Sequence, residues 1–199
     1  MNKIKVGING FGRIGRMILR AYFESINKYN SFEITYVNDL TDNNTNIHLL
    51  KHDSVHGFFN KEITQTSTGM IIDGQIIEFT SEANPENLDW AGKGVDLVFE
   101  CSGRFTKKTD ASKHLLAGAK KVIISAPSEE ADKTVVFGIN HSEIQTSDSV
   151  ISNGSCTTNC LAPIAYILDK EFGIEHGFMT TIHSYTGDQR LIDTAHKEI

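Results

Sequence analysis

Three glycines just after the first apolar segment constrain the fold of this chain more than any other feature. Residues 3–8 alternate as a buried β-strand does, and an apolar stripe with helical spacing begins at Ile14. Between them lie Gly10, Gly12 and Gly15, in the spacing Gly-x-Gly-x-x-Gly. The first allows a tight turn, the second lets the backbone approach a pyrophosphate, and the third lets the helix pack close to the strand. The pattern predicts a dinucleotide-binding β-α-β unit, with the pyrophosphate at the helix N-terminus.

The end of the second predicted strand supports this interpretation. Residues 33–38 are rich in β-formers, and Asp39 follows them, 24 residues after Gly15. A carboxylate at this strand tip accepts hydrogen bonds from ribose hydroxyls and repels a 2′-phosphate, so we expect NAD in preference to NADP. The alternative is that Asp39 only begins a loop, or caps the helix predicted around residues 47–50.

Strands and helices continue to alternate along the chain. Asp73-Gly74, between two apolar segments, predicts a β-hairpin. Further strands are predicted at residues 95–100, 121–125, 134–137 and 150–152, and an amphipathic helix at residues 107–117. This order predicts an α/β fold, a Rossmann-type doubly wound and mostly parallel sheet. Cys101-Ser102-Gly103 ends one central strand, where ligands bind in open α/β sheets.

Cys156 is the second feature with a chemical meaning, because it comes at the start of a predicted helix. Unpaired N–H groups and the positive end of the helix dipole favour a thiolate there. His183 lies 27 residues later, in a strand predicted at residues 175–183, and would complete a nucleophile–base pair. The alternative is a small buried cysteine chosen for packing. Small polar neighbours such as Ser155 and Thr157 favour the catalytic interpretation, whereas Cys160 is interpreted as a structural thiol.

Composition and charge exclude several classes of binding partner and site. The net charge of −6 argues against a nucleic-acid or anionic-membrane surface. Three cysteines make no disulfide framework, which favours a reducing, cytoplasmic compartment. There is no apolar run of the ~18 residues that a membrane helix needs, and no signal peptide is expected at the N-terminus. His48, His52 and His56 lie four residues apart, a spacing that metal ligands can have, but without further ligands nearby we expect no metal site.

Together these motifs resemble phosphorylating glyceraldehyde-3-phosphate dehydrogenases from Ile4 to Ile199. The resemblance is carried by residues 9–16, the Asn38-Asp39 strand tip, residues 50–57, residues 152–160 around Cys156, and residues 183–186. It implies a cytoplasmic, glycolytic homotetramer that converts glyceraldehyde 3-phosphate, NAD and inorganic phosphate to 1,3-bisphosphoglycerate and NADH. The erythrose-4-phosphate dehydrogenases share the cysteine motif and the glycine turn, and remain an alternative.

The resemblance also implies a role for each matching residue. Cys156 would attack the aldehyde, giving a thiohemiacetal and then a thioester, with His183 as acid and base. Substrate or phosphate oxygens would be bound by Ser155, Thr157 and Thr186. NAD would be contacted by Gly10, Phe11, Gly12, Arg13, Ile14, Asp39 and Ser125. Two positions depart from the family's pattern: Gly154 stands where alanine is usual, and Ala83 where arginine is common.

Two domains are expected. Residues 1–155 would form the NAD-binding Rossmann domain, and residues 156–199 would begin an α+β catalytic domain. Family members continue for over a hundred residues beyond the position of Ile199, so the 199-residue chain is expected to be incomplete and inactive alone. A non-catalytic NAD-binding remnant is the alternative from another functional class.

Overall fold

Strand β1 (Ile4–Asn9) lies at the centre of a nine-stranded sheet in the computed structural model, which describes residues 3–25 and 31–186. The strand order is β10-β11-β9-β8-β1-β2-β7-β6-β5. All pairings from β10 to β7 are parallel, and only the edge formed by β7, β6 and β5 is antiparallel. The predicted doubly wound, mostly parallel sheet is therefore confirmed.

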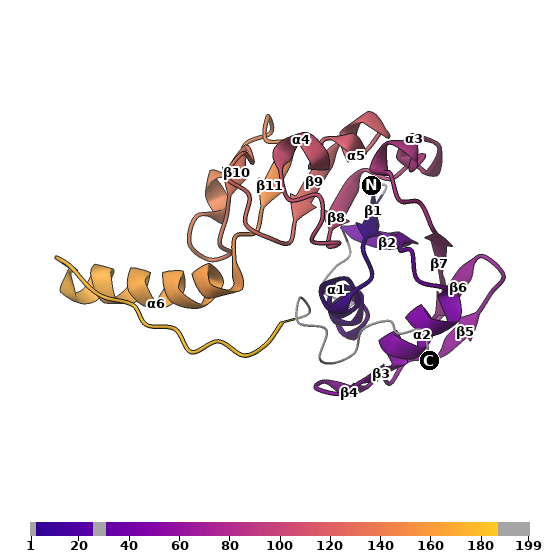
Figure 1. Ribbon diagram of the computed structural model, residues 1–199, viewed down its shortest axis with the longest axis horizontal. Coiled ribbons are helices and arrows are strands. Elements are labelled where there is room, and N and C mark those ends of the chain that lie inside the picture. Colours follow the sequence, from indigo (N-terminus) through magenta and orange to yellow (C-terminus); the bar gives the residue numbers. More distant parts are fainter. Residues whose placement is uncertain (1–2, 26–30, 187–199) are drawn as a thin grey trace.

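The other elements follow in chain order (Figure 1). The strands are β2 (Phe32–Asn38), β3 (His52–Asp53), β4 (Gly57–Phe58), β5 (Ile63–Gln65), β6 (Gly69–Ile72), β7 (Gln75–Thr80), β8 (Leu97–Glu100), β9 (Lys121–Ile124), β10 (Lys133–Thr134) and β11 (Val150–Ser152). The helices are α1 (Arg13–Glu24), α2 (Asn43–Lys51), η2 (Pro85–Asn87), α3 (Trp90–Lys93), α4 (Lys108–Ala111), α5 (Lys113–Leu116), η3 (His141–Glu143) and α6 (Cys156–Phe172). β3 and β4 form a separate two-stranded ribbon.

The chain reverses its direction of winding at β1. It passes from β1 through α1 to β2 on one side, and returns to place β8 on the other side of β1. Figure 1 shows α1 on one face of the sheet and α3, α4 and α5 on the other. In open α/β sheets the crevice at such a switch point, beyond the carboxyl ends of the strands, is where ligands bind.

Apolar side chains on both faces of the sheet explain this arrangement. Val6 and Ile8 on β1 are fully buried in a cluster with Leu19 and Phe23 of α1. On the opposite face Trp90 of α3 and Val98 of β8 are fully buried in a cluster that also contains Leu88, Val95, Ala117 and Ala119. Parallel strands covered on both faces tend towards continuous apolar runs. The first three residues of β8 are such a run, whereas β1 alternates and carries Lys5 and Gly7 between its apolar residues.

The hairpin predicted at Asp73-Gly74 joins β6 and β7. Asp73 has a φ of +47° and Gly74 a φ of +86°, the two left-handed conformations of a type I′ turn. The register pairs Ile72 with Gln75 across the turn. The prediction of a two-residue hairpin is confirmed.

Three predicted elements differ from the structure. The helix predicted at residues 107–117 is two short helices, α4 and α5, that meet at Ser112, whose carbonyl accepts hydrogen bonds from the N–H groups of both Leu115 and Leu116. The strand predicted at residues 134–137 stops at Thr134. The Asn140 side chain accepts a hydrogen bond from the Val136 N–H and donates one to the Thr134 carbonyl, and these bonds turn the chain away from the sheet.

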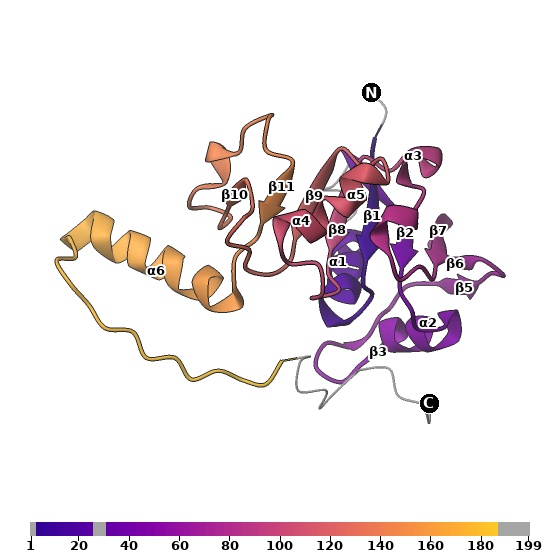
Figure 2. The same cartoon turned by 45° about the horizontal axis from the view of Figure 1, so that its top comes forward.

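The strand predicted at residues 175–183 is the third error. Residues 173–186 have no regular secondary structure and run back along α6 (Figures 1 and 2). A strand needs a neighbouring strand for its backbone hydrogen bonds, and the described residues supply none there. The sequence also predicts a loop and the start of a helix at residues 187–193, which lie outside the described residues.

Helix α6 exposes its apolar side chains. Leu161, Ile164, Ile167 and Phe172 are between 40% and 82% exposed. Within the described part of the chain, no helix combines the length and hydropathy needed to cross a membrane.

Asp132 fastens the edge strands β10 and β11 to helix α4. Its carboxylate accepts hydrogen bonds from Lys108 Nζ at 2.5 Å, from the Ser149 N–H and hydroxyl, and from the Val150 N–H. The hydrogen bond and ion pair with Lys108, followed by those backbone N–H groups, lower the pKa of this carboxyl well below its usual value. Its negative form therefore stabilises the folded state.

We predict that Asp132→Asn lowers the free energy of unfolding by about 2 kcal/mol at pH 7, because hydrogen bonds to a charged group are lost. A lowered pKa contributes stability that is complete above the unfolded pKa of about 3.9 and is lost as the pH falls further. The difference between variant and wild type should therefore shrink below about pH 4. Urea unfolding of both proteins at a series of pH values measures this difference in the free energy of unfolding.

The matched control is Asp110→Asn, whose carboxylate makes a partly exposed pair with Lys113 at 3.5 Å. It should change the unfolding free energy by less than ~0.5 kcal/mol. Equal effects of both substitutions at pH 7 would contradict the role given to Asp132.

Candidate functional site

A cavity of about 270 Å³ lies at the carboxyl ends of β1, β2 and β8. Three residues predicted from the sequence to bind a cofactor line it, namely Gly10, Gly12 and Asp39. The other lining residues are Asn38, Leu40, Thr41, Glu82, Ala83, Cys101, Ser102, Arg104 and Phe105. The cavity therefore occupies the switch point of the sheet.

The three glycines set the backbone of the turn at this cavity, and two of them, Gly10 and Gly12, line it. Gly10 has a φ of +89°, and a Cβ there would come within 2.4 Å of the Ser102 backbone nitrogen. A Cβ on Gly15 would come within 2.3 Å of the Gly10 carbonyl oxygen. At Gly12, by contrast, a Cβ would meet no atom within 4 Å, so the backbone is open to a ligand.

Helix α1 begins directly after this open position. Its N-cap is Gly12, which offers no side chain, and its first turn has no acidic residue. The N-terminal N–H groups and the positive end of the helix dipole are thus directed at a space where an anion can lie. A pyrophosphate fits this cradle, and a carboxylate-bearing cap would not leave room for one.

Asp39 joins the glycine turn to the end of β2. Its Oδ2 accepts the Phe11 N–H at 2.6 Å, and its Oδ1 accepts the Thr41 N–H at 2.8 Å. A carboxylate has about four acceptor positions, so two remain for ligand hydroxyls. The alternative role as a helix cap is wrong, because Asp42 caps α2 by accepting the Thr45 N–H.

Four other residues predicted to contact NAD lie outside the cavity lining. The Phe11 ring is buried in the core, edge-to-face with Phe79. Arg13 forms an ion pair with Asp53 at 3.1 Å, and Ile14 is 49% exposed on α1. Ser125 follows β9, where its N–H donates to the Glu100 carbonyl at 3.0 Å.

Sequence reasoning assigned no cofactor contact to most of the cavity wall. Glu82 and Ala83 follow β7, and Arg104 and Phe105 follow β8, two strands that flank the β1–β2 pair. The signal available in the sequence was their position just beyond predicted strand ends, since carboxyl ends of parallel strands share one edge of a sheet.

Cys156 is the first residue of helix α6, as its sequence context predicted. Ser155 is the N-cap, and its Oγ accepts the Thr158 N–H at 2.9 Å. The chain enters the helix through Gly154, whose φ is +68°. The Cys156 Sγ lies 3.1 Å from His183 Nε2, and both side chains are exposed. The predicted nucleophile and base therefore meet, although His183 comes from coil rather than from a strand.

The hydrogen bonds of this pair set its proton positions. His183 Nδ1 lies 2.6 Å from the Ser184 carbonyl oxygen, so Nδ1 carries a proton and Nε2 faces the thiol. The hydrogen bond to His183, with the Thr157 N–H, lowers the pKa of the Cys156 thiol. The Ser184 carbonyl, and then Cys156, raise the pKa of His183. The pair is biased towards thiolate and imidazolium.

The other predicted substrate residues lie at the same helix end or in the same coil. Ser155 and Thr157 stand on either side of Cys156 at the start of α6, and Thr186 follows His183 by three residues. Cys101, by contrast, is partly buried just after β8, and desolvation raises the pKa of its thiol to about 12. Only the environment of Cys156 favours a reactive thiolate among these two.

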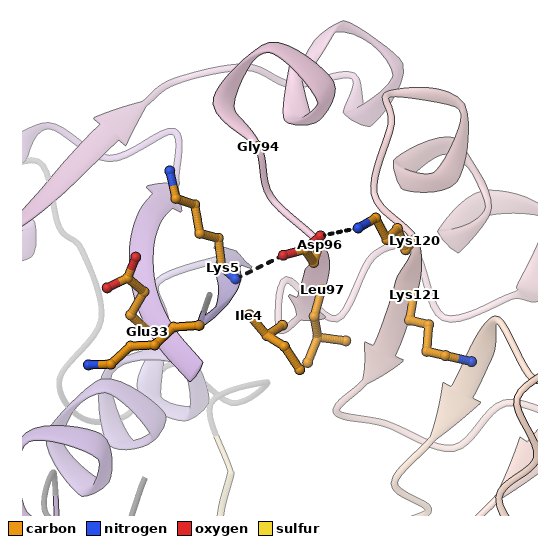
Figure 3. Close-up of a pocket in the computed structure, with 9 residues that line it drawn as sticks. Ile4, Lys5, Glu33, Gly94, Asp96, Leu97, Lys120 and Lys121 are labelled. Atoms are coloured by element: carbon orange, nitrogen blue, oxygen red, sulfur yellow. Dashed lines mark hydrogen bonds and ion pairs between the residues drawn. The ribbon is translucent and has the colours of Figure 1, made fainter. Parts of the chain in front are cut away.

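A larger cavity, of about 980 Å³, lies at the opposite edge of the sheet (Figure 3). Lys120 Nζ is 2.6 Å from Asp96 Oδ1, and Lys121 Nζ donates to the Thr146 carbonyl at 2.9 Å. The Lys5 N–H also donates to Asp96, at 3.1 Å (Figure 3). The ammonium groups of Lys120 and Lys121 already have partners, and the amino ends of parallel strands are not where such sheets bind ligands.

The three histidines with four-residue spacing are not arranged as ligands of one ion. His48 and His52 stack with ring centroids 4.8 Å apart, and His52 also contacts Phe58. In the described ranges, 3–25 and 31–186, no group of three His, Cys, Asp or Glu side chains could hold a metal.

Several curated proteins are similar to this chain over almost its whole length. It is 53% identical over 197 residues to the glyceraldehyde-3-phosphate dehydrogenase of Geobacillus stearothermophilus. It is 50% identical over 196 residues to glyceraldehyde-3-phosphate dehydrogenase 1 of Bacillus subtilis. It is 47% identical over 196 residues to the glyceraldehyde-3-phosphate dehydrogenase of Pseudomonas aeruginosa. Each alignment covers 98% of this chain, and the chain spans 57–58% of the length of these relatives.

A parallel sheet whose glycine turn, helix N-terminus and acidic strand tip surround one cavity defines a Rossmann-type dinucleotide-binding domain. The family model of the glyceraldehyde 3-phosphate dehydrogenase NAD binding domain matches residues 4–108, and that of the C-terminal domain matches residues 155–199. The chain belongs to the glyceraldehyde-3-phosphate dehydrogenase family. It carries that family's NAD-binding domain and the start of its C-terminal domain.

We predict that iodoacetamide alkylates Cys156 much faster than Cys160 or Cys101 near neutral pH, because alkylation requires the thiolate. His183→Ala should move the midpoint of the Cys156 rate–pH profile upward, since the hydrogen bond to His183 is the main cause of its lowered pKa. Mass spectrometry of timed samples between about pH 5 and pH 9 measures both effects.

His176→Ala is the matched control, because His176 is another exposed histidine of the same coil. It should leave the profile of Cys156 unchanged. Similar alkylation rates at all three cysteines in the unaltered chain would refute the assignment of Cys156 as the activated thiol.

Proposed function

We propose that this chain is the NAD-binding and nucleophile-bearing part of a phosphorylating glyceraldehyde-3-phosphate dehydrogenase. Residues 1–155 form the NAD-binding domain in this proposal, and residues 156–199 begin the catalytic domain. The observation that carries it is the 3.1 Å contact between Cys156 Sγ and His183 Nε2 at the N-terminus of α6. Family membership and the cofactor cavity of the same chain support it.

The proposed reaction begins at the Cys156 thiolate. The thiolate attacks the aldehyde carbon of glyceraldehyde 3-phosphate, and the His183 imidazolium gives its proton to the resulting oxyanion, which forms a thiohemiacetal. Bound NAD supplies the acceptor for the hydride of that carbon. As the hydride leaves, His183 takes back the hydroxyl proton and a thioester to Cys156 remains.

Inorganic phosphate then attacks the thioester carbon and releases the Cys156 thiolate, which yields 1,3-bisphosphoglycerate. Ser155, Thr157 and Thr186 are proposed to bind the phosphate oxygens of substrate and of the attacking phosphate. The N-terminal N–H groups of α6 favour negative charge at the same place. The complete protein is proposed to act as a cytoplasmic homotetramer of glycolysis.

We predict that the chain binds NAD at least ~10-fold more tightly than NADP, because Asp39 faces the position of a 2′-phosphate. Asp39→Asn should reduce this preference by removing the negative charge. Fluorescence or calorimetric titration at one fixed salt concentration gives both dissociation constants.

Asp42→Asn serves as the control, since it makes the same chemical change three residues away and asparagine is also a good N-cap. It should keep the ratio of the two dissociation constants. Equal affinities of the unaltered chain for NAD and NADP would disprove the role of Asp39.

The 199-residue chain, assayed alone, is expected to bind NAD weakly and to form no NADH from glyceraldehyde 3-phosphate. His183 lies on an exposed segment that no helix or strand of the described residues holds in place, and a misplacement of ~1 Å can cost ~100-fold in rate. A product with the full length of the relatives should turn over, and Cys156→Ser should abolish that turnover while NAD binding persists. Turnover by the short chain at a rate near that of the long product would contradict this expectation.

A further inference from the structure

A buried carboxylate, Glu100, lies just beneath the cofactor cavity without lining it. It is the last residue of β8 and is 1% exposed. Its Oε1 accepts the Ser102 N–H at 2.8 Å and the Ser102 hydroxyl at 2.5 Å. Its Oε2 lies 2.5 Å from Asn9 Nδ2 and 2.9 Å from His114 Nε2. Four hydrogen bonds thus converge on one buried side chain.

The direction of the hydrogen bonds from His114 follows from Trp90. The indole N–H can only donate, and it lies 3.1 Å from His114 Nδ1, which must therefore accept. A neutral imidazole with an accepting Nδ1 carries its proton on Nε2 and donates it to Glu100. Both rings are fully buried, so no water molecule can replace Trp90 or Glu100 as the hydrogen-bond partner of His114.

A second series of hydrogen bonds reaches Glu100 from the cavity wall. It starts at the Glu82 N–H, which can only donate, and which Asn38 Oδ1 accepts at 2.8 Å. Asn38 Nδ2 then donates to Asn9 Oδ1 at 2.7 Å, and Asn9 Nδ2 donates to Glu100. Thr80 adds its hydroxyl to Asn38 Oδ1 at 3.0 Å.

Three donor-only groups therefore determine the polarity of the whole network: the Trp90 indole, the Glu82 N–H and the Ser102 N–H. Each series ends at Glu100, which must accept at both oxygens. A carboxylate meets this requirement, whereas a carboxamide of the same shape would turn an NH₂ group either towards the donors of Asn9 and His114 or towards the Ser102 N–H. An unsatisfied buried donor is costly in such a network.

We propose that Glu100 is the positioning residue of the cofactor cavity. Its carboxylate orients the Asn9 amide, which orients Asn38, and it holds Ser102 directly. Asn38, Glu82 and Ser102 line the cavity, whereas Glu100 and Asn9 do not. The network thus joins the ends of β1, β2 and β8 and the loop after β7 into one arrangement. The proposal rests on the NAD-binding function proposed above.

The test compares NAD affinity of the 199-residue chain and its variants by calorimetry. Glu100→Gln should weaken NAD binding at least ~10-fold, equivalent to ~1.4 kcal/mol. Glu143→Gln, at an exposed carboxylate paired with Lys133, should stay within about twofold of wild type, because exposed pairs contribute little. Equal NAD binding by a folded Glu100→Gln variant and wild type overturns the proposal.

A rescue variant separates positioning from a general loss of structure. In Asn9→Asp combined with Glu100→Gln, the new amide of residue 100 donates to the new carboxylate of residue 9, which still accepts from Asn38. NAD affinity should recover in part, since one of the two donor conflicts is relieved. A double variant that binds no more tightly than Glu100→Gln contradicts the proposed polarity. If Glu100→Gln does not fold, Asn9→Ala takes its place, and an unchanged NAD affinity there overturns the proposal.

Nitrogen-15 NMR of the histidine rings tests the network without any cofactor. His114 can be assigned by its proximity to Trp90, the one tryptophan of the sequence. The expected form at pH 7 is a neutral ring with the proton on Nε2. A proton on Nδ1 overturns the proposal. A wild-type chain that shows the expected tautomer but binds no NAD would refute the proposed NAD binding and leave the hydrogen-bond network established.

Discussion

The close approach of Gly10 to Ser102 is the contact on which the rest of the site depends. It brings the ends of β1 and β8 together at the point where the winding of the sheet reverses. A side chain on Gly10 would occupy the space of the Ser102 backbone, so the two strand ends could not stay in contact. The glycine turn, the first turn of α1 and the Asp39 carboxylate all take their positions from this approach.

The sheet could be predicted from the sequence because its signals are local. Apolar strand segments, the Asp73-Gly74 turn and the glycine pattern each depend on a few neighbouring residues. One error arises where pairing with a distant segment decides: residues 175–183 have the composition of a strand, but the described residues place no strand beside them. The error at residues 134–137 is local, because the Asn140 side chain bonds the backbone of Val136 and Thr134 and turns the chain away from the sheet.

Some residues of the candidate sites could be predicted from the sequence and others could not. Asp39 and Cys156 could be found because each lies at a strand or helix end that the sequence marks. Glu100, His114 and Trp90 could not, because they are separated by up to 24 residues and their meaning lies in the direction of hydrogen bonds between them. A glutamate at the end of an apolar strand was the only hint, since an unpaired buried carboxylate is costly.

Gly154 changes how firmly the nucleophile is held. Its φ of +68° is a conformation that costs an L-residue with a Cβ about 1 kcal/mol, although a Cβ there would make only ordinary van der Waals contacts, the nearest at 3.7 Å. An alanine, usual here in the resembling family, would fit this space and keep that strain. Glycine releases the strain but has more backbone freedom to lose on ordering. The backbone before Cys156 therefore carries no strain at Gly154. The position of Cys156 depends instead on the Ser155 N-cap and on the hydrogen bonds of the Asn159 side chain.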